Sequence, residues 1–421
     1  MGAAALRNAT LALPLLLVAL AAGWRVRSGD LAGRVPAAVL ATLLAWVGVV
    51  AVESAGSWWT VAPGPTTVLG LPLETSLGWA LAWGALPVLA GGRVLLWWAG
   101  FLWVDVLVVP RLDPLVRLGE HWLLGEALLL VLVAAPALAL GRLTVSRRHL
   151  PTRVVLQVVT FTGLFGWAAP TLALAADGLG WADVVDHGLV GRTLLLVAAV
   201  GVGVPVLAAV AELARVGRGT PFPWDPPDRL VTSGPYAYVR NPMQSGMCLL
   251  LVLLAVAAGS WTLGLGVLVA ATFALAVAEP HEHATLAVRW PGYPSYRRAV
   301  RPWVPRWTPV ADDPATLWVS ETCGLCRATG HTVEGLRPSG VRLRPAESAP
   351  VVLTRMRWCA GDTDDRGVAA LARALERTRL PWAWVGWLVR LPVLGTGVQV
   401  VADACGLGPR VLPAEPGESW A

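Results

Sequence analysis

Long apolar runs separated by short loops fill the first three quarters of the chain. A helix needs roughly 17–25 apolar residues to cross a bilayer. The first run, residues 9–23 after Arg7, could also be the apolar part of a signal peptide, but the further runs make that interpretation unnecessary. The pattern predicts nine spans, at residues 5–23, 35–52, 76–91, 94–110, 121–140, 153–176, 189–211, 243–258 and 261–278.

The number of spans depends on one close pair. Segments 76–91 and 94–110 are separated only by Gly92 and Arg93, so they form either one long span or a tight helical hairpin. Arginine concentrates in cytosolic loops of membrane proteins. With nine spans, twelve arginines of the predicted loops lie inside and four outside. This favours the hairpin, an N-terminus outside and a C-terminal domain in the cytosol.

Composition agrees with a membrane protein. Hydrophobic residues make up 56% of the chain and charged residues 14%, against about 25% charged in soluble domains. Residues 311–421 hold 12 Arg and 12 acidic residues, so the net charge of +6 belongs to residues 1–310. The excess arginine suits lipid headgroups, and nucleic acid is not an expected partner. Five cysteines, an odd number, do not predict a disulfide scaffold.

Polar side chains with possible chemistry flank the last two predicted spans. Residues 234–243 read Gly234-Pro-Tyr-Ala-Tyr-Val-Arg240-Asn241-Pro242-Met243, and all four tyrosines of the chain lie between 236 and 296. A hairpin of two spans would bring Arg240 close to Glu279, Glu282 and His283. Arginine can bind a carboxylate, glutamate an ammonium group, and aromatic rings a sulfonium or a nucleobase. An interfacial ion pair with tyrosines as membrane anchors would give the same pattern.

These motifs resemble the isoprenylcysteine carboxyl methyltransferase and phospholipid methyltransferase family over about residues 150–306. The resemblance rests on the first motif, on Glu282-His283-x-x-Leu286, on Tyr293-x-x-Tyr296, and on Val300 to Pro305. It implies S-adenosylmethionine as cofactor at the cytosolic membrane face and a lipophilic or membrane-proximal acceptor, such as a prenylcysteine-like carboxylate or a lipid. It also implies Arg240, Glu282 and Arg301 as catalytic residues. The cofactor site would be formed by Gly234, Tyr236, Tyr238, Arg240, Asn241, Pro242, Glu279, Glu282, His283, Tyr293 and Tyr296.

The sequence departs from the family pattern at three residues and in one spacing, which is one residue shorter between Trp290 and Tyr293. Asn241 replaces the usual His, Gln244 stands where an aromatic residue is usual, and Glu282-His283 has one carboxylate fewer unless Glu279 supplies it. Methyl transfer from a sulfonium needs no metal, and we predict no metal site.

A Cys-x-x-Cys motif marks the region after residue 314. Strands are expected over 316–320, 341–344 and 351–354, a helix over 367–378, and a Trp-rich segment follows at 381–391. Cys323 and Cys326 follow the first strand and open a helix, where the helix dipole stabilises a thiolate. The layout resembles the thioredoxin-like thiol-disulfide oxidoreductases named for a DCC motif, which implies redox activity and a thiol redox partner. A structural or regulatory remnant of such a domain is the alternative.

The sequence therefore predicts an all-α polytopic membrane domain followed by a small α/β thioredoxin-like domain. Residues 1–150 hold five spans, residues 151–310 the methyltransferase-like core, and residues 311–421 the cytosolic domain. The leading functional hypothesis is a membrane methyltransferase that uses S-adenosylmethionine. The alternatives are a membrane-anchored thiol-disulfide oxidoreductase and a membrane scaffold without catalytic activity.

Overall fold

The computed structural model describes residues 2–225, 227–311 and 313–409. It divides into two compact units. The first unit comprises Met1–Val185, Gly219–Pro226 and Leu254–Gly264, and the second comprises Asp186–Arg218, Pro227–Leu253 and Leu265–Ala421. Part of the predicted domain 151–310 falls in each unit, and residues 410–421 of the last predicted domain lie outside the described residues.

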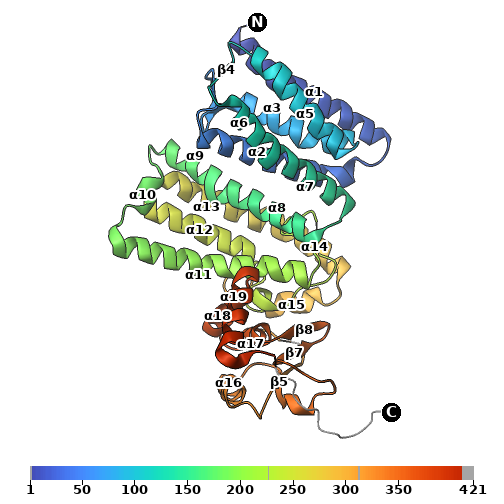
Figure 1. The fold of residues 1–421 in the computed structure, drawn as a ribbon, viewed down its shortest axis with the longest axis vertical. Helices are drawn as coiled ribbons and strands as arrows, with labels where there is room; N and C mark the ends of the chain where they lie inside the picture. The colour runs from blue at the N-terminus through green and yellow to red at the C-terminus, as the bar shows by residue number, and fades with distance from the viewer. Residues whose placement is uncertain (1, 226, 312, 410–421) are drawn as a thin grey trace. The chain divides into compact units, whose positions relative to one another are not determined.

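Helices make up most of the first unit (Figure 1). Its short strands form two antiparallel pairs, β1 (Trp59–Val61) with β4 (Val116–Leu118) and β2 (Thr67–Val68) with β3 (Leu71–Pro72). The helices are α1 (Ala3–Arg27), α2 (Leu31–Ala55), α3 (Leu73–Trp83), α4 (Ala85–Ala90), α5 (Val94–Val108) with η1 (Val109–Arg111), α6 (Trp122–Leu129), η2 (Leu130–Ala134), α7 (Ala135–Ser146), α8 (Leu150–Gly163), η3 (Leu164–Ala168), α9 (Ala169–Ala176) and α10 (Trp181–Val185).

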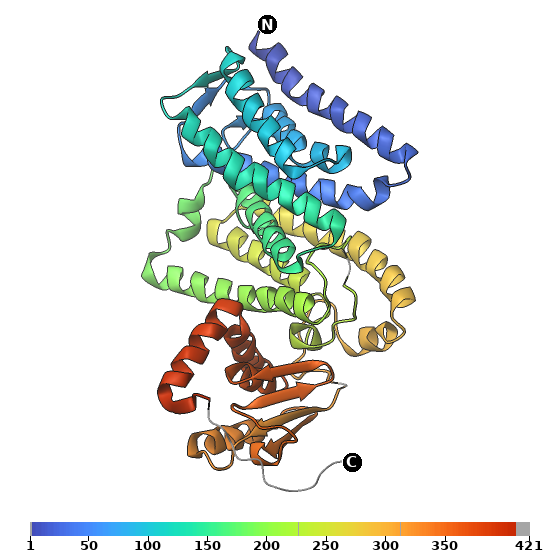
Figure 2. The same cartoon turned by 45° about the vertical axis from the view of Figure 1, so that its right-hand side comes forward.

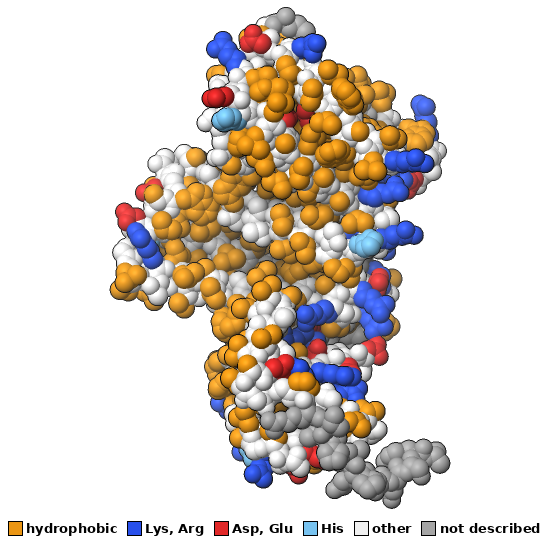
Figure 3. All heavy atoms as spheres, in the orientation of Figure 1, with side chains coloured by type: hydrophobic (Ala, Val, Ile, Leu, Met, Phe, Trp, Pro, Cys, Tyr) orange, Lys and Arg blue, Asp and Glu red, His pale blue; other side chains and the backbone are white. Residues whose placement is uncertain are grey.

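Helix α2 lies at the centre of this unit and packs against α3, α4, α7 and α8. Its side chains Leu40, Val49 and Val50 are almost completely buried. Other helices turn large apolar side chains outward, among them Leu95 and Leu123, and Figure 3 shows such side chains covering much of the visible helical surface. An apolar surface of this size is expected where helices face lipid.

The structure corrects the predicted number of spans. Seven described helices are long and apolar enough to cross a membrane, not nine, and a bent pair near the C-terminus would make eight. Predicted spans 76–91 and 243–258 are the two that fall short. The second of these is α12 (Pro242–Ala258), whose 17 residues rise about 25 Å, less than the hydrocarbon thickness of about 30 Å.

Predicted span 76–91 fails because its helix breaks at Gly84, between α3 and α4. A Cβ atom at Gly84 would lie 2.4 Å from the backbone nitrogen of Thr42 in α2, so only glycine permits this approach of the two backbones. The break leaves helices of 11 and 6 residues.

The second unit joins a helical part to a small sheet domain. Figure 2 shows the four strands of this sheet edge to edge, with helices packed beside them. Helices α12 and α13 contribute residues to both units. The elements are α11 (Gly188–Arg215), η4 (Gly234–Ala237), α12, α13 (Trp261–Phe273), η5 (Ala274–Ala278), α14 (Glu279–Arg289), α15 (Tyr293–Ala299), β5 (Ala315–Val319), α16 (Gly324–Gly335), β6 (Val341–Pro345), η6 (Ala346–Ser348), β7 (Arg357–Ala360), β8 (Thr363–Arg366), α17 (Val368–Leu375), α18 (Leu380–Arg390), α19 (Pro392–Ala402) and η7 (Asp403–Leu407).

The sheet has the order β6-β5-β7-β8, with β5 parallel to β6 and antiparallel to β7, and β7 antiparallel to β8. Alternate residues of β5 point into the core, so Leu317 and Val319 are buried together with Val333 of α16 and Ala370 of α17. Strands β5 and β6 match the predicted strands.

The predicted strand over 351–354 was wrong, because this segment pairs with no strand. Pro350 precedes it, Val351 and Val352 are exposed, and only Leu353 is buried. The next strand begins at Arg357. Beyond β8, the predicted helix over 367–378 is confirmed by α17, which is shorter and spans Val368–Leu375, and the Trp-rich segment forms α18.

Candidate functional site

Backbone hydrogen bonds join the two half-motifs on either side of α12 and α13. The loop 237–241 runs beside the segment 301–310. Four bonds connect them: Arg240 N–H to the Arg301 carbonyl at 2.8 Å, Asn241 N–H to Pro302 at 3.1 Å, Arg306 N–H to Tyr238 at 2.9 Å, and Val310 N–H to Ala237 at 2.9 Å. The position of Arg240 is therefore fixed by main-chain contacts on both sides of the helical hairpin.

Arg240 meets the acidic start of α14. Its guanidinium forms an ion pair and hydrogen bond with the Glu279 carboxylate, and it also donates to the Arg297 carbonyl at 3.3 Å. The side chains of Arg240 and Glu279 are 7% and 15% exposed. Glu282, one turn further along α14, is close enough to both to interact with them electrostatically. This confirms that the hairpin brings Arg240 to Glu279 and Glu282.

Aromatic rings line the same place. The His283 ring lies 6.0 Å from that of Tyr293, whose ring is 6.4 Å from that of Tyr296. The Tyr296 hydroxyl donates to the Tyr236 carbonyl at 2.9 Å. Burial raises the pKa of Tyr236, Tyr293 and Tyr296. All three are therefore neutral phenols at physiological pH, able to donate hydrogen bonds.

Several buried polar atoms of the motif have no hydrogen-bond partner among the described residues. They are Tyr236 Oη, Asn241 Nδ2, Gln244 Oε1 and His283 Nε2. His283 Nε2 lies 3.4 Å from a Glu279 oxygen, but the geometry is not that of a hydrogen bond. Buried polar atoms are usually paired, so unpaired atoms gathered in one motif indicate groups available to a polar ligand. We call Arg240, Glu279, Glu282, His283, Tyr236, Tyr293 and Tyr296 the Arg240 cluster.

Three predicted site residues have other contacts. Tyr238 is completely buried, and its hydroxyl contacts the carbonyls of Glu376 and Thr378 at 3.0 and 2.8 Å, so it is bound to the sheet domain rather than available to a cofactor. The side chain of Arg301 is exposed, and its carbonyl receives the Arg240 N–H. Pro242 is buried as the first residue of α12, where its missing N–H is not needed.

The sequence analysis did not identify Glu212. This residue lies near the end of α11 and contacts Ser233 and Gly234 at the start of the first motif. Its carboxylate accepts hydrogen bonds from Ser233 at 2.5 Å, Arg373 at 2.7 Å and Arg390 at 3.0 Å, and Arg390 also binds Glu376 at 2.6 Å. An acidic residue at the end of a long apolar helix was a signal that partners were needed. Its two arginine partners, Arg373 and Arg390, lie more than 150 residues away along the chain.

Gly234 lies directly against Glu212. Its φ of +61° is unfavourable for other residues, and a Cβ atom there would lie 3.1 Å from the Glu212 side chain. This glycine allows the loop to approach the buried carboxylate.

Cys323 and Cys326 lie where the sequence predicted. Cys323 is the residue that precedes α16, directly after the turn that follows β5, and Cys326 is in the first turn of α16. Glu347 holds the turn before Cys323: it accepts bonds from the Ser320 hydroxyl at 2.7 Å and the Glu321 amide at 3.1 Å.

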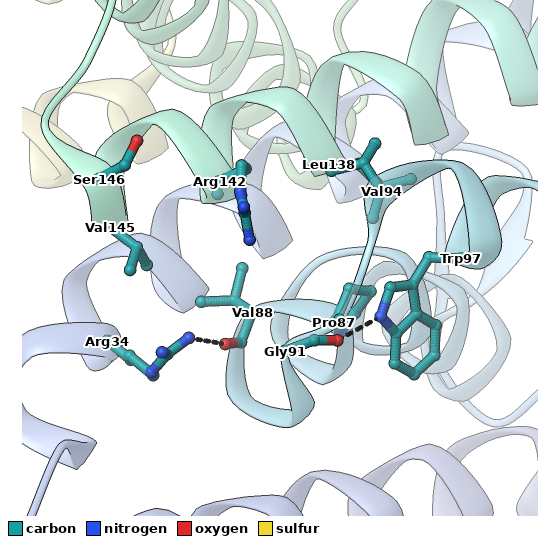
Figure 4. A pocket seen from close by; sticks show the side chains of 12 residues that line it. Arg34, Pro87, Val88, Gly91, Val94, Trp97, Leu138, Arg142, Val145 and Ser146 are labelled. Atoms are coloured by element: carbon teal, nitrogen blue, oxygen red, sulfur yellow. Dashed lines mark hydrogen bonds between the residues drawn. The ribbon is translucent and has the colours of Figure 1, made fainter.

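A separate cavity of about 120 Å³ lies in the first unit. Figure 4 shows Arg142 directed toward Val88, while Arg34 donates to the Val88 carbonyl at 3.0 Å and Trp97 donates to the Gly91 carbonyl at 2.6 Å. None of the predicted site residues lines it. Within residues 2–225, 227–311 and 313–409, no three His, Cys, Asp or Glu side chains gather closely enough to hold a metal ion.

The fold and the site define a helical integral membrane protein with a buried Arg–Glu pair beside tyrosines. Residues 194–287 match the family model described as phospholipid methyltransferase. The match includes Arg240, Glu279, Glu282 and His283, and it supports a membrane methyltransferase. Comparisons with curated proteins and with solved structures gave no match.

Proposed function

We propose that this protein is an integral membrane methyltransferase that uses S-adenosylmethionine and acts on a lipophilic or membrane-proximal acceptor. The observation that carries this proposal is the Arg240 cluster within the matched region. It combines a buried guanidinium, two acidic side chains and three phenols, and two of its buried polar atoms, Tyr236 Oη and His283 Nε2, have no hydrogen-bond partner among the described residues.

The residues present fit the chemistry of this cofactor. Arg240 is the group for the amino-acid carboxylate, and Glu279 or Glu282 for the ammonium group. The neutral rings of Tyr293 and Tyr296 offer electron-rich faces to a sulfonium. Tyr236, Asn241 and Gln244 supply hydrogen bonds to the remaining polar atoms. When bound, the cofactor supplies a methyl group on a positively charged sulfur, which leaves as a neutral thioether.

The chain's own contribution is alignment and exclusion of water. The four backbone bonds between the half-motifs hold Arg240 in a fixed position, and such pre-organisation lowers the barrier to transfer between two bound reactants. A buried site also strengthens the electrostatic contacts of Arg240.

Calorimetry tests this proposal by measuring the binding of S-adenosylmethionine to the detergent-purified protein. The wild type is expected to bind, and Arg240→Ala to lose binding at least about tenfold, because a charged hydrogen bond contributes about 1.5–3 kcal/mol. Arg289→Ala is the matched control: it removes an arginine from α14 whose pairing with Asp228 is exposed, 3.6 Å apart. The absence of wild-type binding, or equal binding by Arg240→Ala, would contradict the proposal.

A second function has support in the sheet domain. We propose thiol-disulfide exchange by Cys323 and Cys326, because Cys323 lies at the N-terminus of α16 in a domain whose strand order β6-β5-β7-β8 suits a thioredoxin-like fold. Alkylation of Cys323 measured across pH should show a thiolate well below pH 8. An ordinary thiol profile would exclude this activity.

A further inference from the structure

The last two helices of the described chain differ from the rest of the sheet domain. Helices α18 and α19 are joined at Leu391 with a bend of 89°, and together they are long and apolar enough to enter a membrane. No charged residue occurs between Arg390 and Asp403. Yet they belong to the region that the sequence predicted to be cytosolic.

Helix α18 packs against the membrane helix α11. Ala383 and Trp387 are buried against Val204 and Ala208 of α11. Figure 1 shows α18 beside α11, with α19 following α18, within the second unit. The contact therefore involves the middle part of α11 and not only its end.

One hydrogen bond fixes the depth of this contact. Pro205 lies inside α11 and has no N–H, so the carbonyl of Gly201, four residues earlier, loses its partner within the helix. The indole N–H of Trp384 donates to that carbonyl at 3.0 Å. An unpaired carbonyl is costly in hydrocarbon. Gly201 is roughly 20 Å from either end of the 28-residue α11, which places it near the middle of a span.

The outer side of α18 and α19 is apolar, and the polar side chains of α19 have hydrogen-bond partners. Val393, Val400 and Val401 of α19 are 85%, 63% and 62% exposed. Gln399 accepts a bond from the Val368 amide and donates one to Asp403, and Thr396 donates to the Pro392 carbonyl. Helix α11 likewise exposes Leu196, Val197 and Val200 next to Gly201 in sequence.

We propose that α18 and α19 form a re-entrant element that lies in the hydrocarbon layer beside α11, with lipid acyl chains covering the exposed face of α19. The occupant is lipid because the depth of Gly201 leaves α18 no aqueous surroundings, and because α19 presents no unpaired polar side chain among the described residues. Trp384 of α18 also supplies the hydrogen bond to the Gly201 carbonyl that Pro205 cannot make within α11.

Spin-label accessibility in the full-length protein tests the location. Nitroxides are attached at Val393→Cys and Val400→Cys, each in a background with the five native cysteines replaced, and the protein is placed in phosphatidylcholine bilayers. The matched control is Val352→Cys, which is 57% exposed in the loop before β7. Labels at 393 and 400 should collide several-fold more often with oxygen than with a water-soluble nickel chelate, and the label at 352 should show the reverse. The proposal would be overturned if the nickel chelate reached the labels at 393 and 400. It would also be overturned if neither oxygen nor the chelate reached these labels because a second copy of the protein covered them.

A double-mutant cycle tests the hydrogen bond independently. Trp384→Phe should lower the thermal unfolding midpoint of the wild type in detergent. In a Pro205→Ala background, where residue 205 again donates to Gly201, the same change should have a clearly smaller effect. Equal effects in both backgrounds would show that Trp384 does not serve this carbonyl.

Discussion

At the scale of single residues, the Arg240 cluster contains buried polar atoms that have no hydrogen-bond partner among the described residues. Tyr236 is the clearest case, since its ring packs against Leu213 and Val231 while its hydroxyl has no partner among the described residues. The cost of burying a hydroxyl without a bond is about 1–3 kcal/mol. A ligand that accepts this bond would recover part of that cost.

Tyr236→Phe is therefore expected to leave stability unchanged or raise it, while weakening S-adenosylmethionine binding. One lost hydrogen bond corresponds to about 1 kcal/mol, or roughly fivefold in Kd. Tyr296→Phe serves as the contrasting variant, because its hydroxyl donates to the Tyr236 carbonyl and its loss should lower stability. Thermal unfolding and calorimetry measure both effects. A Tyr236→Phe protein that is destabilised and binds normally would contradict this role.

A titratable residue supports the turn before Cys323. Burial acts to raise the pKa of Glu347, but hydrogen bonds from Ser320, Glu321 and Thr322 outweigh it and lower the pKa from 4.5 to about 2. Because the folded pKa is depressed, the ionised form stabilises the turn above about pH 4.5, and this stabilisation is lost as pH falls toward 2.

Hydrogen exchange at the Glu321 and Thr322 amides checks this prediction. Their protection, corrected for the intrinsic exchange rate, should decrease between pH 4.5 and 2 in the wild type. In Glu347→Gln it should be low and independent of pH. Protection that stays constant across this range in the wild type would show that Glu347 does not hold the turn.

At the scale of elements, the hairpin of α12 and α13 was predictable and the break at Gly84 was not. Two consecutive apolar runs joined at Gly259 and Ser260 predicted a helical hairpin whose two ends lie together, so the meeting of Arg240 with Glu279 followed from the sequence. The contact of Gly84 with Thr42 depends on how two helices pack, and hydropathy carries no information on it. The ion partners of Glu212 were unpredictable for the same reason.

The loop before α12 depends on Gly234. Gly234→Ala places a Cβ atom at positive φ and 3.1 Å from Glu212, which should destabilise the protein by about 1–3 kcal/mol and weaken cofactor binding by moving Arg240. Gly292→Ala is the control, since φ is −76° there and no atom lies within 4 Å of an added Cβ. Thermal unfolding compares them. Equal midpoints for the two variants would contradict the packing described.

At the scale of the whole molecule, the sheet domain and the motif share a buried ionic network within the second unit. Arg373 binds Glu212 of α11, Asp365 of β8 and Glu376. Removing one partner of a buried network leaves unpaired charge, which typically costs about 3–5 kcal/mol. The sheet domain should therefore support the site even if its cysteines have a separate role.

Arg373→Ala is expected to lower the unfolding midpoint and to reduce S-adenosylmethionine binding, although Arg373 is not in the Arg240 cluster. Arg366→Ala removes a neighbouring arginine whose ion pair with Asp364 is exposed, 3.7 Å apart, and should cost less than about 1 kcal/mol. Unfolding and binding are measured on both variants. If Arg373→Ala behaves like Arg366→Ala, the network does not join the sheet domain to the motif.

Transfer of a labelled methyl group tests the central claim most directly. Membranes containing the wild type, Arg240→Ala or Arg289→Ala are incubated with S-adenosylmethionine labelled in its methyl group, and lipid, small-molecule and protein fractions are counted. The wild type and Arg289→Ala should place label in a lipophilic or membrane-bound fraction, and Arg240→Ala should not. Label that stays in the cofactor with every variant, or that transfers equally with Arg240→Ala, would contradict a methyltransferase site built on Arg240.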